Sequence, residues 1–472
     1  MFFGSRDPYR KLKKRIGHHK VLDQQDDLVT YAVDASYTAP PGNHDPNVVI
    51  MAETPEDVQE AVRFARTSGM KIVPRGAGTG MSAGSVPIGG GMVICTEKMK
   101  LIREVNTTGR WIQCEMGLTT AEVKDAVARH RFLYPPDPSS FKISSIGGNI
   151  AENAGGLRCV KYGTTKEYVL GLRYVNAFGE LISTGVLAGD EANPLDLTPL
   201  LVGSEGLFGI IVEARLAVVP EPKATRTVIA HYPDPQQAIA AIQSILPELL
   251  PSVVEFMDDA VIDAIRQHDP YPFPEGTMAS LIVETDGPTD NADAEMNRVL
   301  EILDQYGALE LHTAANAAER ERLWQLRRLV SPGLSRIASG KMNEDVVVPL
   351  GSQGELLRRV REISERTGIV IPVYGHAGDG NLHLNSMYDK DDMKQERIAH
   401  DAIVECFKAV VELGGTISGE HGIGAAKNRY MRIQYDAPEL ELFLRLKQAF
   451  DPDGLFNPYK LFPPDLTVLH EA

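Results

Sequence analysis

The sequence predicts an α+β fold assembled from α/β subdomains, on three observations. Apolar strand-like runs alternate with amphipathic helical segments from Val48 onward. Glycine-rich stretches follow strand-like runs, most densely at 76–91. The chain has 472 residues, more than one hydrophobic core usually organises. We therefore expect two or three subdomains.

Composition narrows the class of protein. The chain is 43% hydrophobic and 24% charged, as in ordinary globular proteins. Its formal net charge of −16 argues against nucleic acid as the main partner, because phosphate binding needs clustered Lys and Arg. Its four cysteines are scattered without a CxxC pair, which indicates reduced thiols and no in-chain iron–sulfur cluster of the usual spacing. No run of eighteen apolar residues occurs, so we expect no membrane-spanning segment. The scattered reduced thiols indicate an intracellular protein, which we expect to be cytoplasmic.

The first twenty residues, MFFGSRDPYRKLKKRIGHHK, are basic and lack an apolar core of signal-peptide length. We interpret them as a solvated first helix. The alternative is a peripheral contact with the acidic inner face of a membrane or with an electron-accepting partner.

The α/β pattern begins with a strand at 48–53. Thr54 and Pro55 predict a helix start, and Gly69 ends that helix. A second strand, 71–76, runs into the glycine-rich loop GAGTGMSAGSVPIGGG. The exposed N–H groups of such a loop suit an anion, most plausibly a pyrophosphate. The loop is neither a Walker loop nor a good dinucleotide fingerprint, and a plain loop is the alternative interpretation.

The next part of the chain offers a second ligand-binding backbone. A strand at 111–119 leads to a helix that Thr119 and Glu122 cap. The segment 134–138 is rigid and extended because of its prolines. Beyond it, small and polar residues would let backbone lie against a flat ligand, and Gly147–Gly148 would open a helix near a phosphate. A hairpin at 171–185 and a glycine turn followed by a strand at 203–220 close this unit.

A constellation of histidines and acids organises the C-terminal half. It comprises YGHAGDGNLHLN at 374–385 and SGEHGIG at 418–424. Strand-like flanks would place His376 and His383 at two strand ends around a turn, with converging imidazoles. Glu420 would complete two imidazoles and one carboxylate, which suit a divalent metal with open positions. His421 would then be available as a base.

The alternative for these histidines is a hydrogen-bonded structural role. A seven-residue spacing between two histidines matches no standard zinc signature. The second cluster and the upstream loops favour the metal hypothesis. Zinc is our first choice of metal, with manganese and iron as alternatives.

Several of these segments together resemble a known family. The chain resembles the FAD-binding domain of vanillyl-alcohol oxidase-type flavoproteins in five segments: PRGAGTGMSAG, YPPDPSS, SIGGNIAENAGG, YGTT and GSEGLFGIIVEA. The chain also resembles the FAD-linked 2-hydroxy-acid dehydrogenase branch of these flavoproteins, in the segments YGHAGDGNLHLN, SGEHGIGAAKNRYM and FDPDGLFNPYKLF. That branch includes D-lactate dehydrogenases, the flavin subunit of glycolate oxidase and D-2-hydroxyglutarate dehydrogenase. The resemblance spans about 28–462.

The resemblance implies an FAD-binding domain of two subdomains at 1–222, a substrate or cap domain at 223–410, and a segment at 411–472 that returns to the flavin. The alternation of strands and helices between 226 and 314 suggests a ferredoxin-like cap. No histidine stands at Gly78–Thr79–Gly80, where covalent flavoproteins of this superfamily often carry one, so we expect non-covalent FAD. The matching cofactor-binding residues are Pro74, Arg75, Gly76, Ala77, Gly78, Thr79, Gly80, Ser82, Pro138, Ser144, Gly147, Gly148, Asn149, Asn153, Gly155, Gly156, Tyr162, Gly163, Glu205, Gly206, Gly209, Ile210, Ile211, Glu420 and Asn457.

The resemblance also implies the roles of the site residues. It assigns metal binding to His376, His383 and Glu420, and proton abstraction to His421. Arg327 and Lys341 fall where the family segment binds the substrate carboxylate, although a solvated helix surface would also explain Arg327.

We therefore expect FAD-dependent, metal-assisted oxidation of a D-2-hydroxy acid, with D-lactate or glycolate first. D-2-Hydroxyglutarate or D-malate oxidation is the same-class alternative, and a non-catalytic flavin-binding subunit is the different-class one. The electron acceptor would be a quinone, a cytochrome, an electron-transfer flavoprotein or an iron–sulfur subunit. We also expect a homodimer.

Overall fold

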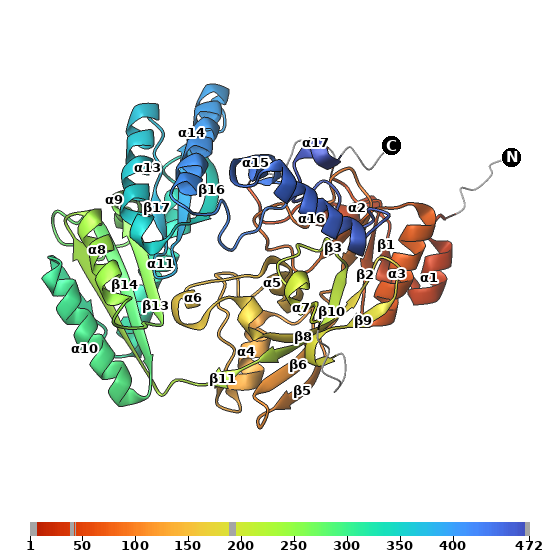
Figure 1. Ribbon diagram of the computed structural model, residues 1–472, viewed down its shortest axis with the longest axis horizontal. Helices are drawn as coiled ribbons and strands as arrows, with labels where there is room; N and C mark the ends of the chain where they lie inside the picture. Colours follow the sequence, from red (N-terminus) through yellow and green to blue (C-terminus); the bar gives the residue numbers. More distant parts are fainter. Residues whose placement is uncertain (1–6, 38–41, 43, 188–194, 468–472) are drawn as a thin grey trace. The chain divides into compact units, whose positions relative to one another are not determined.

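A computed structural model describes residues 7–37, 42, 44–187 and 195–467, and the chain divides into two compact units (Figure 1). Unit 1 comprises Met1–Ala154, Thr164–Pro220 and Glu420–Ala472. Unit 2 comprises Gly155–Gly163 and Glu221–Gly419. Residues 1–6 of the basic N-terminal stretch lie outside the described residues.

Unit 1 contains two main sheets. Four strands form one sheet in the order β1-β2-β4-β3, five form another in the order β5-β6-β10-β8-β9, and β7 pairs with β11. The strands are β1 Val21–Leu22, β2 Val48–Met51, β3 Ile72–Arg75, β4 Met92–Cys95, β5 Ile102–Asn106, β6 Trp111–Glu115, β7 Phe132–Leu133, β8 Val169–Val175, β9 Leu181–Ser183, β10 Ile210–Ala217 and β11 Val219–Pro220. The helices are α1 Arg10–Ile16, α2 Gln25–Leu28, α3 Pro55–Ser68, α4 Thr120–Ala128, α5 Ile146–Glu152, α7 Thr198–Leu201, α15 Met431–Gln434, α16 Ala437–Phe450 and α17 Pro464–Thr467.

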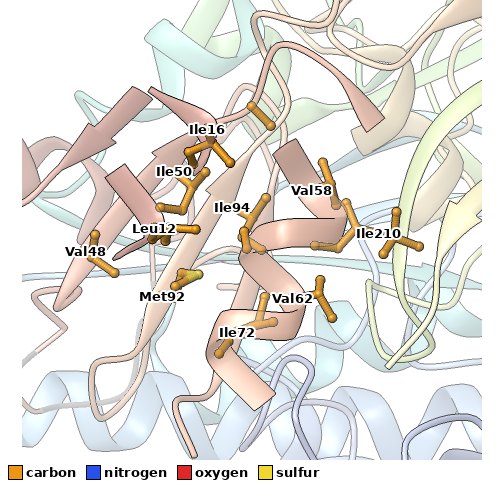
Figure 2. Packing of buried hydrophobic residues seen from close by; sticks show 14 of the residues in the cluster. Leu12, Ile16, Val48, Ile50, Val58, Val62, Ile72, Met92, Ile94 and Ile210 are labelled. Carbon is orange, nitrogen blue, oxygen red and sulfur yellow. The ribbon is translucent and has the colours of Figure 1, made fainter. Parts of the chain in front are cut away.

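Local sequence explains the helix that covers the first sheet. Thr54 caps α3 by accepting from the N–H of Asp57, and Gly69 ends it in the left-handed conformation, as predicted. The apolar face of α3 packs with α1 and the strands into one core (Figure 2). Leu455 and Phe456 belong to the same core, because the N–H of Ile72 donates to the carbonyl of Leu455 at 2.8 Å. The C-terminal segment is therefore part of the fold of unit 1.

Unit 2 is built on one antiparallel sheet of seven strands, in the order β15-β12-β14-β13-β17-β18-β16. The strands are β12 Ala224–Tyr232, β13 Val253–Asp258, β14 Ala279–Gly287, β15 Glu310–Thr313, β16 Gly340–Val347, β17 Val373–His376 and β18 Asn381–Tyr388. The helices are α6 Cys159–Tyr162, α8 Pro235–Ile245, α9 Asp259–Arg266, α10 Thr289–Gln305, α11 Ala317–Arg328, α12 Val330–Leu334, α13 Gln353–Thr367 and α14 Met393–Glu412.

The first four of these strands form the predicted ferredoxin-like arrangement. With α8 and α10 they follow the order β-α-β-β-α-β and lie in the sheet as fourth, first, third and second. Strands β17, β18 and β16 extend that sheet beyond β13. The sequence did not predict β5, β13 or β16.

Side-chain contacts separate the two faces of the seven-stranded sheet. The hydroxyl of Thr285 donates to a carbonyl of α10, and that of Ser386 donates to a carbonyl of α14. The neighbouring side chain Glu284 points to the opposite face and binds α11 through Arg320 and Trp324. The cross-strand register places Glu255, His376 and His383 on this α11 face.

Two further predictions concern membranes and thiols. Among the residues with described positions, no helix is both long and apolar enough to cross a bilayer. The four cysteines form no disulfide. Burial raises the pKa of the Cys95, Cys114 and Cys406 thiols to about 12, so these groups are poor nucleophiles near neutral pH.

Candidate functional site

The glycine-rich loop of unit 1 passes against the start of α5. Strand β3 ends at Arg75, and the half-buried backbone of 76–80 follows. A Cβ atom on Gly76 would lie 2.1 Å from Ser145 Oγ, too close for any side chain. Ser145 caps α5 by accepting from the N–H of Gly148 at 3.2 Å. Two glycine-rich backbones predicted to bind cofactor therefore lie side by side.

The other predicted cofactor residues of 134–153 surround this helix start. Ser144 and Asn149 are buried, and Asn149 Nδ2 donates to Thr120 Oγ1 at 2.6 Å. A Cβ on Gly147 would lie 2.9 Å from Met116 Cβ. Asn153 ends α5 in the left-handed conformation. Pro138 accepts a turn hydrogen bond from the N–H of Phe141.

Glu205 is the centre of a buried polar cluster in unit 1. Its carboxylate accepts from the N–H of Ile423 at 2.8 Å and of Gly424 at 2.6 Å. Burial raises the pKa of Glu205, against the effect of these two donors. Asn457 Nδ2 donates to the carbonyl oxygens of Gly84 at 3.1 Å and of Glu205 at 2.7 Å. Three predicted segments, at 203–211, 418–424 and 450–462, thus meet here.

Lys460 completes the cluster. Its side chain is buried, and Nζ donates to Asn457 Oδ1 at 2.6 Å. Burial lowers the pKa of Lys460 to about 7, although Asp34, Glu205 and Glu152 oppose that shift. The sequence analysis assigned this lysine no role.

The remaining predicted residues of unit 1 border the same region. Gly206 has φ +71°, and a Cβ there would lie 3.0 Å from Pro74 Cγ. The carbonyl of Ser82 accepts from the N–H groups of Ala425 and Ala426 at 3.0 Å. Gly209 precedes Ile210 and Ile211, which begin β10.

Gly155, Gly156, Tyr162 and Gly163 belong to unit 2 instead. The hydroxyl of Tyr162 donates to Asp286 Oδ2 at 2.8 Å, and Lys161 Nζ lies 2.7 Å from Asp286 Oδ1. Asp286 therefore anchors this short segment to β14.

The predicted metal ligands converge on the α11 face of the sheet. His376 ends β17 and His383 lies in β18, with ring centroids 5.3 Å apart and ring planes at 87°. Glu420 follows Gly419, whose N–H donates to Asp345 Oδ2 on β16 at 2.6 Å. One ligand atom from each of His376, His383 and Glu420 lies within 4.8 Å of the other two. The expected convergence of two imidazoles and one carboxylate is therefore present.

These residues fit a divalent cation. The two histidines are buried and Glu420 is half-buried, so the three donors are close together and partly shielded from water. Two nitrogens and one oxygen form a set that zinc accepts. Asn385 Oδ1 is buried and accepts no hydrogen bond from the described residues, as expected beside a site for a polar ligand.

Glu255, which the sequence analysis missed, joins two predicted site residues. It is fully buried on β13. Its Oε1 pairs with His376 Nδ1, and its Oε2 accepts from Arg327 Nε. Burial opposes ionisation, but His376 and Arg327 outweigh it and lower the pKa of Glu255. The sequence signal that could have indicated Glu255 as a site residue is a carboxylate within an otherwise apolar strand segment.

Arg327 also packs on an aromatic ring of the site. Its guanidinium carbon lies 4.7 Å from the centroid of the Tyr374 ring. Lys341 is buried on β16, and its Nζ lies 3.5 Å from Ser331 Oγ. Arg327 therefore packs on the α11 face of the sheet and Lys341 is buried in a strand, so neither belongs to a solvated helix surface.

Comparisons with known proteins give the family. The FAD-linked oxidase C-terminal domain matches residues 221–461, and the FAD binding domain matches residues 46–185. Glycolate oxidase subunit GlcD of Bacillus subtilis (strain 168) is 34% identical over 98% of each chain. D-lactate dehydrogenase of Anaerostipes hadrus is 31% identical over 89% of this chain and 90% of that protein. 4-Ethylphenol oxidase from Gulosibacter chungangensis, solved with isoeugenol, has a TM-score of 0.78 at 18% identity, covering 98% of this chain and 99% of that one.

This chain belongs to the family of FAD-linked oxidases. It is an oxidoreductase of the flavin-dependent class, and its fold is the vanillyl-alcohol oxidase type that the sequence motifs indicated.

Proposed function

We propose that this protein is an FAD-dependent, metal-assisted dehydrogenase of D-2-hydroxy acids, with D-lactate or glycolate as first substrates. The observation that carries the proposal is the convergence of His376, His383 and Glu420 in a chain that also has the FAD binding domain. The relatives named as a glycolate oxidase subunit and a D-lactate dehydrogenase support the substrate class.

The reaction removes two electrons and two protons from the substrate. The alcohol carbon loses a hydride and the hydroxyl loses a proton, so the hydroxy acid becomes a 2-oxo acid. FAD, when bound, supplies the acceptor for the hydride. The glycine-rich backbone at 76–80, the start of α5 and the Glu205–Asn457 cluster are the groups that would hold it.

Unit 1 fits such a cofactor. Ser82 Oγ and the Tyr134 hydroxyl are buried and have no hydrogen-bond partner among the described residues, which is the pattern expected where a polar ligand completes a site. The hydroxyl of Ser145 lies against Gly76 and leaves no space for a side chain there. Because no histidine lies in 76–80, we propose that FAD is held without a covalent bond.

His376, His383 and Glu420 would hold a divalent cation, which supplies Lewis-acid polarisation of the hydroxyl. We propose zinc first, with manganese and iron as alternatives. His421 takes the hydroxyl proton, because histidine is the side chain that most often acts as a general base.

Arg327 and Lys341 recognise the substrate carboxylate. Arginine suits this task because its terminal nitrogens match the two carboxylate oxygens. Lys341 is buried and the Arg327 side chain is only 11% exposed, so such pairing is stronger than at an open surface. Their hold would orient the alcohol carbon so that its C–H bond faces the flavin.

The electrons then leave to an acceptor other than NAD: a quinone, a cytochrome, an electron-transfer flavoprotein or an iron–sulfur subunit. The name of the Bacillus subtilis relative, an oxidase subunit, supports a partner protein.

Anaerobic bleaching of the flavin by a panel of D- and L-2-hydroxy acids tests this function. We expect D-lactate or glycolate to bleach it, L-lactate to be slower, and treatment with a strong chelator to stop bleaching. Preference for D-2-hydroxyglutarate or D-malate would move the substrate to the dicarboxylate class. A yellow protein that no hydroxy acid bleaches would be a non-catalytic flavin-binding subunit, and a colourless one would refute the proposal.

A further inference from the structure

Glu255 uses both carboxylate oxygens on residues of the proposed site. Oε1 pairs with Nδ1 of His376, a proposed metal ligand, and Oε2 accepts from Nε of Arg327, the proposed carboxylate-binding residue. All three residues belong to unit 2. The strand register β13–β17 brings Glu255 opposite His376, so the sheet itself fixes this contact.

Further contacts connect these three residues into a closed cycle of side chains. The Arg327 guanidinium lies over Tyr374 at 4.7 Å, and the Tyr374 ring lies 5.1 Å from His383. His383 meets His376 at 5.3 Å between ring centroids. The cycle of contacting side chains therefore runs from Arg327 through Tyr374, His383, His376 and Glu255 back to Arg327. Both proposed histidine ligands and the proposed anchor of the substrate carboxylate belong to this cycle of contacts.

The chemistry of each contact points the same way. An imidazole that donates from Nδ1 presents the lone pair of Nε2, which is the form that a cation binds. An arginine whose Nε is engaged must use Nη1 and Nη2 to pair with both oxygens of a carboxylate. Glu255 thus sets the tautomer of one group and the direction of the other.

We propose that Glu255 is the positioning residue that holds the metal ligand His376 and the carboxylate anchor Arg327 in register for the same substrate. This inference rests on the proposed function, because it assigns Glu255 a task only if His376 binds a cation and Arg327 binds the substrate. In this role Glu255 acts through the two side chains that its carboxylate contacts.

The chain offers a matched control. Glu284 is also fully buried, lies on the neighbouring strand β14 and points to the same face. It accepts from Arg320 Nε and Nη2 at 2.6 and 2.9 Å and from Trp324 Nε1 at 2.8 Å. Glu284 therefore has the same burial and a similar partner, but its hydrogen bonds involve no proposed metal ligand. Loss of either carboxylate should disturb the fold to a similar degree.

The test compares Zn²⁺ affinity in full-length protein stripped of metal, by competition with a chromophoric chelator. We expect Glu255→Gln to weaken Zn²⁺ binding about 10- to 100-fold, and Glu284→Gln to leave it within about threefold of the wild type. Glu255→Gln should also raise KM for D-lactate. FAD content and Tm report whether each variant is folded, and Glu255→Asp replaces Glu255→Gln if the latter does not fold.

The outcomes separate the two proposals. A folded Glu255 variant with wild-type Zn²⁺ affinity would overturn the role of Glu255 while leaving the metal site intact. An equal loss of Zn²⁺ affinity in the Glu284 variant would show that the loss in the Glu255 variant comes from general damage to the sheet, and would overturn the specific role of Glu255. A wild-type protein that binds no divalent cation would remove the metal-assisted function itself.

Discussion

Asn457 donates a hydrogen bond of 2.7 Å to the backbone carbonyl of Glu205, a residue 252 positions earlier in the chain. The Glu205 carboxylate in turn holds the N–H groups of Ile423 and Gly424. A polar cluster inside unit 1 therefore orders the short segment that begins with Glu420 and His421.

Glu205→Ala should loosen that segment. Two buried N–H groups would lose their acceptor, at about 1–3 kcal/mol each. We expect a lower Tm and a Zn²⁺ affinity reduced about tenfold or more, because Glu420 lies three residues before Ile423. Calorimetry and metal competition measure these effects. Glu213→Ala removes another buried carboxylate of unit 1 and should leave Zn²⁺ affinity unchanged; equal losses would disprove a specific link.

His421→Ala should separate binding from chemistry. We expect normal FAD and metal content, with anaerobic flavin reduction by D-lactate slowed about 10²- to 10⁴-fold, the usual contribution of a general base. Stopped-flow absorbance of the flavin measures the rate. Reduction at near the wild-type rate would remove His421 as the base. His400→Ala, on α14, is the control and should reduce normally.

Arg327→Lys should weaken substrate binding more than it slows chemistry. Lysine keeps the positive charge beside Glu255 but loses the paired donors, so KM for D-lactate should rise about 10- to 100-fold. Steady-state kinetics with an artificial electron acceptor measure KM and kcat. The adjacent Arg328, exposed and paired with Glu321, gives the control Arg328→Lys. An unchanged KM in Arg327→Lys would argue for a solely structural arginine.

Gly76→Ala should reduce FAD binding. The added Cβ would meet Ser145 Oγ at 2.1 Å, so either the loop or the cap of α5 must move. We expect a lower ratio of flavin to protein absorbance and FAD affinity reduced at least tenfold. Gly351→Ala is the control, since no atom lies within 4 Å of its Cβ and its φ is ordinary. Full flavin occupancy in Gly76→Ala would place the cofactor elsewhere.

His231 should make the protein acid-sensitive. Burial lowers the pKa of His231 to about 4, from an ordinary value of 6.5, and its ring contacts Ser280 Oγ at 2.8 Å and the Tyr271 hydroxyl at 3.2 Å. Between these values the unfolded chain binds the extra proton and the folded chain does not. The free energy of unfolding therefore falls as pH drops through this window, by about 2 kcal/mol at pH 5.

Urea unfolding of the wild type and of His231→Gln, at pH 7.5 and pH 5, measures this contribution. The variant should lose about 2 kcal/mol less than the wild type over the same interval. An identical loss in both proteins would show that His231 titrates normally in the folded chain.

Much of the fold followed from local signals in the sequence. Thr54 and Gly69 bound α3 as expected, and strands and helices alternate from β12 to β15, as expected for 226–314. Strand β13 was missed because Glu255 and Asp258 interrupt its apolar run, and buried acids in a strand look like loop residues when their partners are unknown. The partners of Glu255, Arg327 and His376, are supplied by tertiary structure.

The site divides in the same way. Glycine, histidine and acid clusters predicted His376, His383 and Glu420, and the structure brings their donor atoms together. No local pattern predicts that Asp345 holds the N–H of Gly419, because that contact depends on the position of β16 in the sheet. Cross-strand neighbours are set by register between distant segments.

The division of the chain into interleaved segments has a consequence for biosynthesis. Every segment of unit 2 has been synthesised once Gly419 is made, whereas unit 1 still lacks Leu455 and Phe456 of its own core. Unit 1, which precedes unit 2 in the sequence, is therefore completed after it, against the usual order of vectorial folding. Nascent chains stalled before Leu455 should be unable to capture flavin, even though most of the nucleotide-binding backbone has already been translated.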